Sequence, residues 1–375
     1  MQKGLPFPLA KPSVYLLLAL GVCLRILAAT RGHNYDFDSY LIVIQIMDAG
    51  GNVYAETSRY NYGPIWFNIL HFLYIISAKN TLIFRYILAF FLSAVDLGIF
   101  FILFKKFSFK PAAYFFLSPV SIIITGFHNQ FDNLAVLTAL IAVDLMGDKF
   151  KERLNKHQIA GLFLLGISLT TKHLFFIFPL WLAAKHRSFS QKIIILLVPT
   201  CVFILSFLPY WNEGKEGIIH NVFLYNSYNN EFFYNLIISD FLKQSISSKV
   251  VWLLILIAGA YIYKQESLVK TLLYYTGVLV GVSPSISNQY LAIPIPYLSV
   301  ENNLFSALYT VVATINLFID YDGLHFPALA TLGVFDRNFY YLILVILIIS
   351  HLFRDRITSL LTKTGPKRHN EGTTI

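Results

Sequence analysis

Apolar segments separated by short polar intervals run along almost the whole chain. A helix that crosses a bilayer needs about 20 apolar residues, and shorter segments are kinked or partly interfacial. The pattern therefore predicts about twelve spans in an all-α, polytopic transmembrane helical bundle. These spans lie at roughly 13–30, 81–104, 112–127, 133–147, 158–171, 174–184, 193–209, 249–263, 268–283, 290–300, 303–319 and 338–353.

One further apolar segment, Pro64 to Ser77, is interpreted as a juxtamembrane helix that lies at the interface. Counting it as a span would break the alternation of charge between successive loops. With this choice, residues 31–80 form a large first loop that contains juxtamembrane helices. Residues 1–353 then make a single transmembrane domain, and residues 354–375 a basic cytoplasmic tail.

Charge alternates between the two sets of loops. One set is basic and the other is acidic, and positively charged loops stay on the cytoplasmic side. Both termini are therefore expected in the cytoplasm, with the acidic loops on the far side. The basic set includes Lys105, Lys106, Lys110, Lys149, Lys151, Arg153, Lys185 and Arg187, and the acidic set includes Asp36, Asp38, Asp48, Glu213, Glu216, Asp240, Asp320 and Asp322.

Composition supports an integral membrane protein. Hydrophobic residues make up 56% of the chain and charged residues 13%, against roughly 25% charged residues in a soluble domain. The net charge of +9 does not indicate a nucleic-acid partner, because the basic residues lie between spans. Cys23 and Cys201 fall within apolar segments and lack the spacing of metal ligands, so no zinc site or disulfide framework is expected.

Two aspartates in the first loop are the leading candidates for chemistry. Ser39 to Ala49 is expected to form a short helix that Gly50-Gly51 ends. Asp38 then occupies the N-cap position, where a carboxylate accepts hydrogen bonds from free backbone N–H groups. A structural role and a catalytic role for Asp38 are equally well supported. Asp36 lies one step outside the cap and is the first candidate for a catalytic group.

Three further polar runs fall at the same side of the predicted bundle. They contain His128, Gln130 and Asp132 in the run 126–133, Lys172 and His173 in the run 170–173, and Gln289 and Tyr290 in the run 283–290. Arg85 lies near the same end of the second span. A solvated turn is the structural alternative for the first run. For Lys172 the alternative is a side chain that extends to the membrane surface.

Together these groups suit the transfer of a sugar from a lipid phosphate. A general base must take the proton of the attacking hydroxyl. The phosphate leaving group needs fixed cations, and the sugar hydroxyls need amide, imidazole and tyrosine partners. We assign Asp36 as the base and Lys172 as the main charge for the phosphate, with His173 or Arg85 assisting.

The sequence resembles the GT-C class of integral membrane glycosyltransferases, which use polyprenyl- or dolichyl-phosphate sugars. The acidic motif of the first loop is Tyr35-Asp36-Phe37-Asp38-Ser39-Tyr40 here. Gly51-Asn52-Val53-Tyr54 and Tyr60-Asn61-Tyr62-Gly63-Pro64 are similar to a run in GPI and bacterial polyprenol-dependent mannosyltransferases, which usually have Thr-Pro or Pro-Pro in place of Gly63-Pro64.

Other motifs resemble those of dolichyl-phosphate-glucose-dependent glucosyltransferases. These are Arg85-Tyr86 with Asp96, the run from His128 to Asn133, and Lys172-His173 with Pro179; Ser283-Pro284 with Gln289-Tyr290 is similar to a late motif of bacterial members. The resemblance implies an inverting hexosyltransferase that moves mannose or glucose to a hydroxyl of a lipid, glycan or protein. It implies an extracytoplasmic site in a bacterial plasma membrane or the endoplasmic reticulum, with Asp36 and Asp38 catalytic. The substrate-binding residues would be Lys172, His173, Arg85, His128, Gln130, Asp132, Tyr60, Tyr62, Gln289 and Tyr290.

Two other functions stay open. A transporter or flippase of a lipid-linked saccharide should place its polar residues at mid-bilayer, often in symmetric halves. Here they gather at one rim, and no internal repeat is found. A polysaccharide polymerase usually carries arginine-rich functional loops late in the chain. The sequence establishes no cofactor. It leaves a divalent metal open, because a monophosphate donor has less need of one than a nucleotide diphosphate does.

Overall fold

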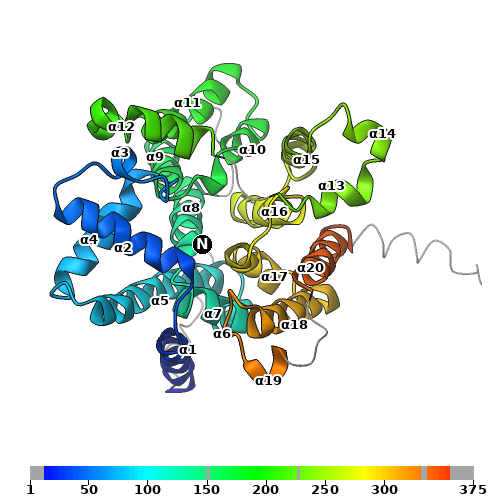
Figure 1. Cartoon of the computed structure of the whole chain (residues 1–375). Helices are drawn as coiled ribbons and strands as arrows, with labels where there is room; N and C mark the ends of the chain where they lie inside the picture. The colour runs from blue at the N-terminus through cyan, green and yellow to red at the C-terminus, as the bar shows by residue number, and fades with distance from the viewer. Residues whose placement is uncertain (1–11, 148–149, 151–152, 226–228, 331–335, 355–375) are drawn as a thin grey trace, which may run out of the picture.

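The computed structural model describes residues 12–147, 150, 153–225, 229–330 and 336–354, and these residues form helices and no β-strand (Figure 1). The first half contains α1 (Pro12–Thr30), α2 (Tyr35–Asp48), α3 (Val53–Glu56), α4 (Pro64–Ile76), α5 (Thr81–Lys106), α6 (Phe109–Leu117), α7 (Pro119–Gly126), α8 (Asp132–Met146), α9 (Lys156–Thr171) and η2 (His173–Phe175). The all-α expectation is thus confirmed for the described residues. The basic tail from Asp355 onward, Lys149 and Lys151 lie outside them.

The second half continues in shorter elements. It contains α10 (Phe178–Ala184), α11 (Phe189–Leu205), η3 (Leu208–Tyr210), α12 (Trp211–Gly217), η4 (Ile218–Phe223), α13 (Phe232–Ile237), α14 (Asp240–Lys243), α15 (Ser248–Ile262), α16 (Leu268–Gly281), η5 (Asn288–Ala292), α17 (Ile295–Val300), α18 (Leu304–Ile319), α19 (Pro327–Ala330) and α20 (Arg337–Leu352). Figure 1 shows α2–α4 at one side of the molecule and α13–α15 at the other.

Helix α8 lies at the centre of the bundle and contacts α5, α9 and α16. Between Leu134 and Val143 its only polar side chain is Thr138, and most of these side chains are buried, as in a helix that is largely surrounded by protein. Its alanines let neighbouring backbones approach closely, as small residues do in membrane bundles. At Gly161 of α9, an added Cβ would collide with Met146 and with the carbonyl oxygen of Ala142. The polar run 126–133 precedes this central helix, so its side chains are carried into the interior.

The predicted count of twelve spans is not confirmed. Among the described residues, three helical stretches are long and apolar enough to cross a membrane: α1, α5 and the continuous run Phe189–Phe223. Helices α6 and α7 make a fourth stretch only as a pair, bent by 48°. Pro119 begins α7, and a proline fits the first turn of a helix but ends the one before it. The predicted spans 174–184 and 290–300 are broken into short helices.

The first loop folds as a packed unit. Helices α2, α3 and α4 share an apolar cluster that includes Phe37, Tyr54, Trp66 and Phe67, all at most 2% exposed. Helix α4 matches the apolar helix expected at 64–77, and Gly50, with φ of +77°, follows the end of α2 as expected. This packing fixes the position of the N-terminus of α2.

The expected start of that helix is wrong. Helix α2 begins at Tyr35, because Asn34 is the N-cap and its side chain accepts a 3.2 Å hydrogen bond from the backbone N–H of Asp36. Asp38 is therefore not the cap. Both aspartates lie in the first helical turn, where the helix dipole favours negative charge.

Candidate active site

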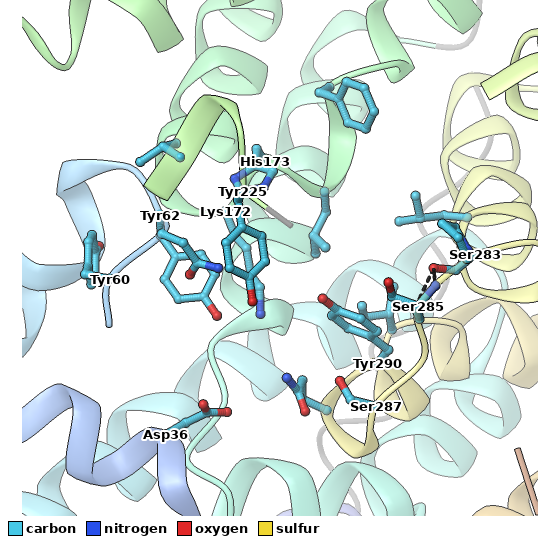
Figure 2. Close-up of a pocket in the computed structure, with 18 of the residues that line it drawn as sticks. Asp36, Tyr60, Tyr62, Lys172, His173, Tyr225, Ser283, Ser285, Ser287 and Tyr290 are labelled. Atoms are coloured by element: carbon cyan, nitrogen blue, oxygen red, sulfur yellow. Dashed lines mark hydrogen bonds between the residues drawn. The ribbon is translucent and has the colours of Figure 1, made fainter. Parts of the chain in front are cut away.

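A cavity of about 950 Å³ lies between the first loop, the segment that follows α9, the segment around η4, and the segment between α16 and η5. Figure 2 shows Asp36, Tyr62, Lys172 and Tyr290 around it. One part of its wall is apolar and aromatic, with Phe176, Phe203, Phe223, Trp252 and Ile293; another is polar, with Ser283, Ser285, Ser287 and Gln289. The cavity therefore fits a ligand that is polar at one end and apolar at the other.

Asp36 is directed into this cavity from the first turn of α2 (Figure 2). The side-chain amide of Gln130 donates a hydrogen bond to its Oδ2, and Asn34 Nδ2 lies 3.5 Å from the same atom. Burial raises the pKa of the Asp36 carboxyl above its ordinary value, and the nearby Lys172 and Gln130 oppose this effect. A carboxylate that is partly desolvated in this way is a stronger base than an exposed one.

Lys172 lines the cavity, and its side chain is buried and not extended outward. It caps the C-terminal end of α9 in an extended conformation, and its side chain is 4% exposed. Its Nζ donates to Asp132 Oδ2 at 2.8 Å. The rings of Tyr62, Phe131 and Tyr290 surround the ammonium with centroids 5.0, 4.9 and 5.9 Å away. An ammonium has three donors, and Asp132 takes one of them.

Tyr60 and Tyr62 have different roles in the wall. The hydroxyl of Tyr60 donates to the carbonyl of Gly63 at 2.6 Å and accepts from the N–H of Phe67, so it holds the start of α4. Tyr62 faces the cavity (Figure 2). Gly63 packs on the end of α9, and an added Cβ would overlap the carbonyl oxygen of Thr170. This contact gives a physical reason for glycine at this position.

Five of the expected site residues do not line the cavity. Two of them, Gln130 and Asp132, bind the side chains of Asp36 and Lys172, which do line it. The other three are Asp38, Arg85 and His128. Asp38 is 52% exposed and its carboxylate is 3.8 Å from His33. Arg85 donates to the carbonyl of Ala29 and lies near the ring of Phe37. His128 is fully buried and accepts a 2.9 Å hydrogen bond from Asn34, the residue that caps α2. Burial lowers the pKa of His128 to about 4, so the ring is neutral and supports Asp36 through Asn34.

His173 and Tyr290 line the cavity, as does Gln289. Burial and the adjacent Lys172 lower the pKa of His173 to about 4. The ring is therefore neutral near pH 7 and can offer a hydrogen bond but no positive charge. A contribution of His173 beside Lys172 would therefore be a hydrogen bond.

The structure adds residues that the sequence did not single out. Arg59 lines the cavity, lies with its guanidinium 3.8 Å from the ring centroid of Tyr35, and donates to the Tyr35 carbonyl. Lys249 also lines the cavity, as does Asn229. Arg59 comes directly before the tyrosine motif, which was the signal that could have found it. Lys249 and Asn229 come from a region whose sequence carries no comparable motif.

Metal ligation was left open by the sequence. Within the part of the chain that the structure describes, no group of three or more His, Cys, Asp or Glu side chains is placed to hold a metal ion. Asp38, the second carboxylate of the D-x-D pair, is exposed outside the cavity, so the two carboxylates do not converge.

Comparison with known proteins identifies the fold. No protein-family model matches the chain, and no curated protein sequence matches it. Two crystal structures of ArnT from Cupriavidus metallidurans are similar. The one bound to undecaprenyl phosphate is 14% identical with a TM-score of 0.50, over 96% of this chain and 82% of that chain. The apo structure is 12% identical with a TM-score of 0.51, over 95% and 81%.

A weaker similarity is to the apo oligosaccharyltransferase of Archaeoglobus fulgidus, at 11% identity and a TM-score of 0.42, over 96% of this chain and 59% of that chain. At 12–14% identity, the similarity to the ArnT structures shows the fold alone. The protein has the fold of the GT-C class of membrane glycosyltransferases.

Proposed function

We propose that this protein is an inverting glycosyltransferase that moves a hexose, mannose or glucose, from a polyprenyl- or dolichyl-phosphate donor to a hydroxyl acceptor. The observation that carries the proposal is the position of Asp36, a carboxylate of raised pKa, in a cavity that also contains a buried ammonium and an apolar wall. The fold supports it, since one similar structure is described as bound to undecaprenyl phosphate.

The residues of the cavity account for each step of the transfer. Asp36 accepts the proton of the acceptor hydroxyl while the acceptor oxygen attacks the anomeric carbon. The bond from that carbon to the phosphate oxygen breaks on the opposite face, and its electron pair stays on the phosphate. The free donors of Lys172 stabilise the charge that develops on this leaving group. The anomeric configuration is inverted, because the displacement has one step.

A donor panel tests the proposal. Membranes that contain the protein are incubated with radiolabelled polyprenyl-phosphate sugars, and transfer to endogenous or added hydroxyl acceptors is measured. Transfer by the wild type, with loss in Asp36→Asn, is expected. A flippase would instead move the intact labelled lipid across the bilayer of sealed vesicles, and this result without transfer would overturn the proposal.

We also propose that the site lies on the extracytoplasmic side, which the distribution of charge between loops supports. In a protein whose Cys23 and Cys201 are replaced by serine, a cysteine at Glu56 should react with a membrane-impermeant thiol reagent from outside. A cysteine at Lys110 should react only after permeabilisation. Both positions are exposed in the structure. The opposite labelling would place the cavity in the wrong compartment for this donor.

A further inference from the structure

The segment between α16 and η5, residues 282–287, has irregular backbone and forms one wall of the cavity. The side chains of this segment and of the start of η5 divide between the cavity and the protein interior, and from Ile286 to Gln289 they alternate. Ser283, Ser287 and Gln289 are partly exposed and line the cavity, whereas Ile286 and Asn288 are buried at 4% and 2% exposure. Successive side chains of an extended chain face opposite ways, and Ser287 has extended dihedral angles.

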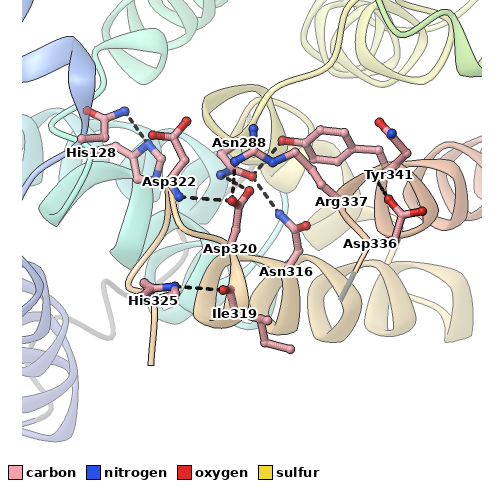
Figure 3. A network of polar contacts seen from close by, with 12 residues as sticks. His128, Asn288, Asn316, Ile319, Asp320, Asp322, His325, Asp336, Arg337 and Tyr341 are labelled. Carbon is pink, nitrogen blue, oxygen red and sulfur yellow. Dashed lines mark hydrogen bonds and ion pairs between the residues drawn. The ribbon is translucent and has the colours of Figure 1, made fainter. Parts of the chain in front are cut away.

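The buried side of this segment is anchored by polar contacts. Figure 3 shows Asn288 within a network in which it donates to Asp320 at 2.8 Å and accepts from Asn316 at 2.8 Å and Tyr341 at 3.0 Å. Asp320 also pairs with Arg337. These contacts hold the start of η5 against α18 and α20.

A second anchor holds the segment at Ile286, on the other side of Ser287. The side chain of Asn230 donates to the carbonyl of Ile286 at 2.8 Å and accepts from its N–H at 3.2 Å. The backbone of the wall is therefore fixed on both sides by residues that do not line the cavity. The side chains of Ser287 and Gln289 make no hydrogen bond within the described part of the chain, so their polar atoms are available to a ligand.

The part of the wall that residues 283–290 form carries no charged side chain. Among the described residues that line the cavity, Asp36 is the sole carboxylate, and the cations are Arg59, Lys172 and Lys249. A protonated amine on the sugar would need a carboxylate at this wall, and Asp36 cannot serve both as its partner and as the base. A carboxylate on the sugar would need a cation at this wall, where the segment offers hydroxyls and an amide.

We infer that Ser287 and Gln289 form a specificity wall that selects an uncharged, polyhydroxy sugar and rejects sugars with a free amine or a carboxylate. The inference rests on the proposed function and names the class of sugar that the same cavity takes. Hydroxyl and amide groups both donate and accept hydrogen bonds, as sugar hydroxyls do. A fixed backbone holds them in place before the donor binds, which strengthens discrimination.

The test compares three donors on one polyprenyl phosphate: a neutral hexose, an aminohexose with a free amine, and a hexuronic acid. For the wild type we expect kcat/KM for the neutral sugar to exceed both others by at least about tenfold, in the range that pocket contacts provide. Gln289→Glu should lower use of the neutral donor and raise use of the aminohexose. Ser287→Ala should lower kcat/KM for the neutral donor and leave transfer of the charged donors low.

Gln244→Glu is the matched control, because Gln244 is exposed outside the cavity and the change adds the same charge. It should leave the preference unchanged. Wild-type transfer of a charged sugar as fast as the neutral one would overturn the specificity wall and leave the proposed function standing. An unchanged preference in Gln289→Glu would also overturn it. Failure to transfer any of a wide panel of sugars would overturn the proposed function, and this inference with it.

Discussion

Among the described residues, two ion pairs have both side chains buried, and they differ in how many further hydrogen bonds hold them. Arg25 on α1 pairs with Asp96 on α5, and both side chains are 0% exposed. Lys172 pairs with Asp132, with side chains 4% and 2% exposed. An isolated charge is costly to bury, so each pair is expected to be held by further contacts.

In the first pair both carboxylate oxygens of Asp96 accept hydrogen bonds, and we call this pair closed. Asp96 Oδ2 accepts from Arg25 at 2.9 Å and from Thr125 at 2.7 Å, and its Oδ1 accepts from Asn133 at 2.7 Å. Arg25 also donates to the carbonyls of Gly21 and Phe116. This pair joins α1, α5, α7 and α8, and none of its residues lines the cavity. Its role is to fix the helices that carry the site.

In the second pair only one carboxylate oxygen of Asp132 has a partner among the described residues, and we call this pair open. Lys172 lines the cavity and uses one donor on Asp132, and Asp132 Oδ1 has no partner among the described residues. Both pairs contact the start of α8, because Asn133 donates a hydrogen bond to Asp96 of the first pair and Asp132 is a member of the second. The closed pair thus positions the open one, and the open one keeps hydrogen-bonding capacity for a ligand.

The largest expected effect concerns the base that faces the open pair. Asp36→Asn keeps the shape of the side chain but cannot accept a proton, and losing a general base typically lowers the rate about 10²–10⁴-fold. kcat/KM for transfer should fall by this amount, while the thermal unfolding midpoint of the purified protein stays within a few degrees. Near-normal transfer would mean that the cavity of the open pair is not the catalytic centre.

The closed pair should govern stability. Asp96→Asn leaves Arg25 charged and buried, and breaking a buried pair costs roughly 3–5 kcal/mol. The double variant Arg25→Met with Asp96→Asn removes both charges and should recover most of the stability and the activity. Unfolding in detergent, followed by denaturant titration, measures both. A double variant that is stable but inactive would give the closed pair a part in the reaction.

The matching experiment on the open pair should give the opposite pattern. Lys172→Met should raise the apparent KM for the lipid donor and slow turnover, by about tenfold or more for a lost charge-assisted contact to phosphate. Adding Asp132→Asn removes the unpaired carboxylate and should restore stability but not activity. Recovery of transfer in this double variant would make Lys172 a structural residue.

Much of the fold could be predicted from the sequence. Apolar runs indicated α1, α5, α8, α16 and α20 near their observed positions, because burial and lipid both select apolar side chains. The bend between α6 and α7 was not found, since a single proline at the start of a helix leaves the apolar pattern unbroken. The start of α2 was missed because Asn34 and Asp38 are both good caps, and the packing of Phe37 and Tyr40 decides between them.

The site was only partly predictable. Polar residues inside apolar runs pointed to Asp36, Lys172 and Gln289, because they are costly to bury without a purpose. The pairing of Lys172 with Asp132, 40 positions away, depends on how α8 and α9 pack. Arg25 was overlooked, since one charge in a long apolar segment hardly changes its pattern.

A smaller effect is expected in the pH profile. Because burial raises the pKa of Asp36, and the base must be ionised, kcat/KM should fall on the acid side with a midpoint above the ordinary aspartate value of about 3.9. Gln130→Leu removes a hydrogen bond that lowers this pKa, so the midpoint should move further up. His173 adds no charge change above its pKa of about 4. A midpoint that does not move in the variant would exclude Asp36 as the titrating group.

The smallest effect should come from Asp38, which lies two residues from Asp36 but on the exposed side of the same helical turn. Its carboxylate interacts favourably with the helix N-terminus, which is worth about 0.3–1 kcal/mol. Asp38→Asn should therefore change stability by at most this amount and keep most of the transfer activity. The assay that measures Asp36→Asn serves here as well, and the two variants are matched in size and in the charge removed. An inactive Asp38→Asn beside an active Asp36→Asn would exchange the two assignments. Loss of activity in both variants would contradict the prediction for Asp38.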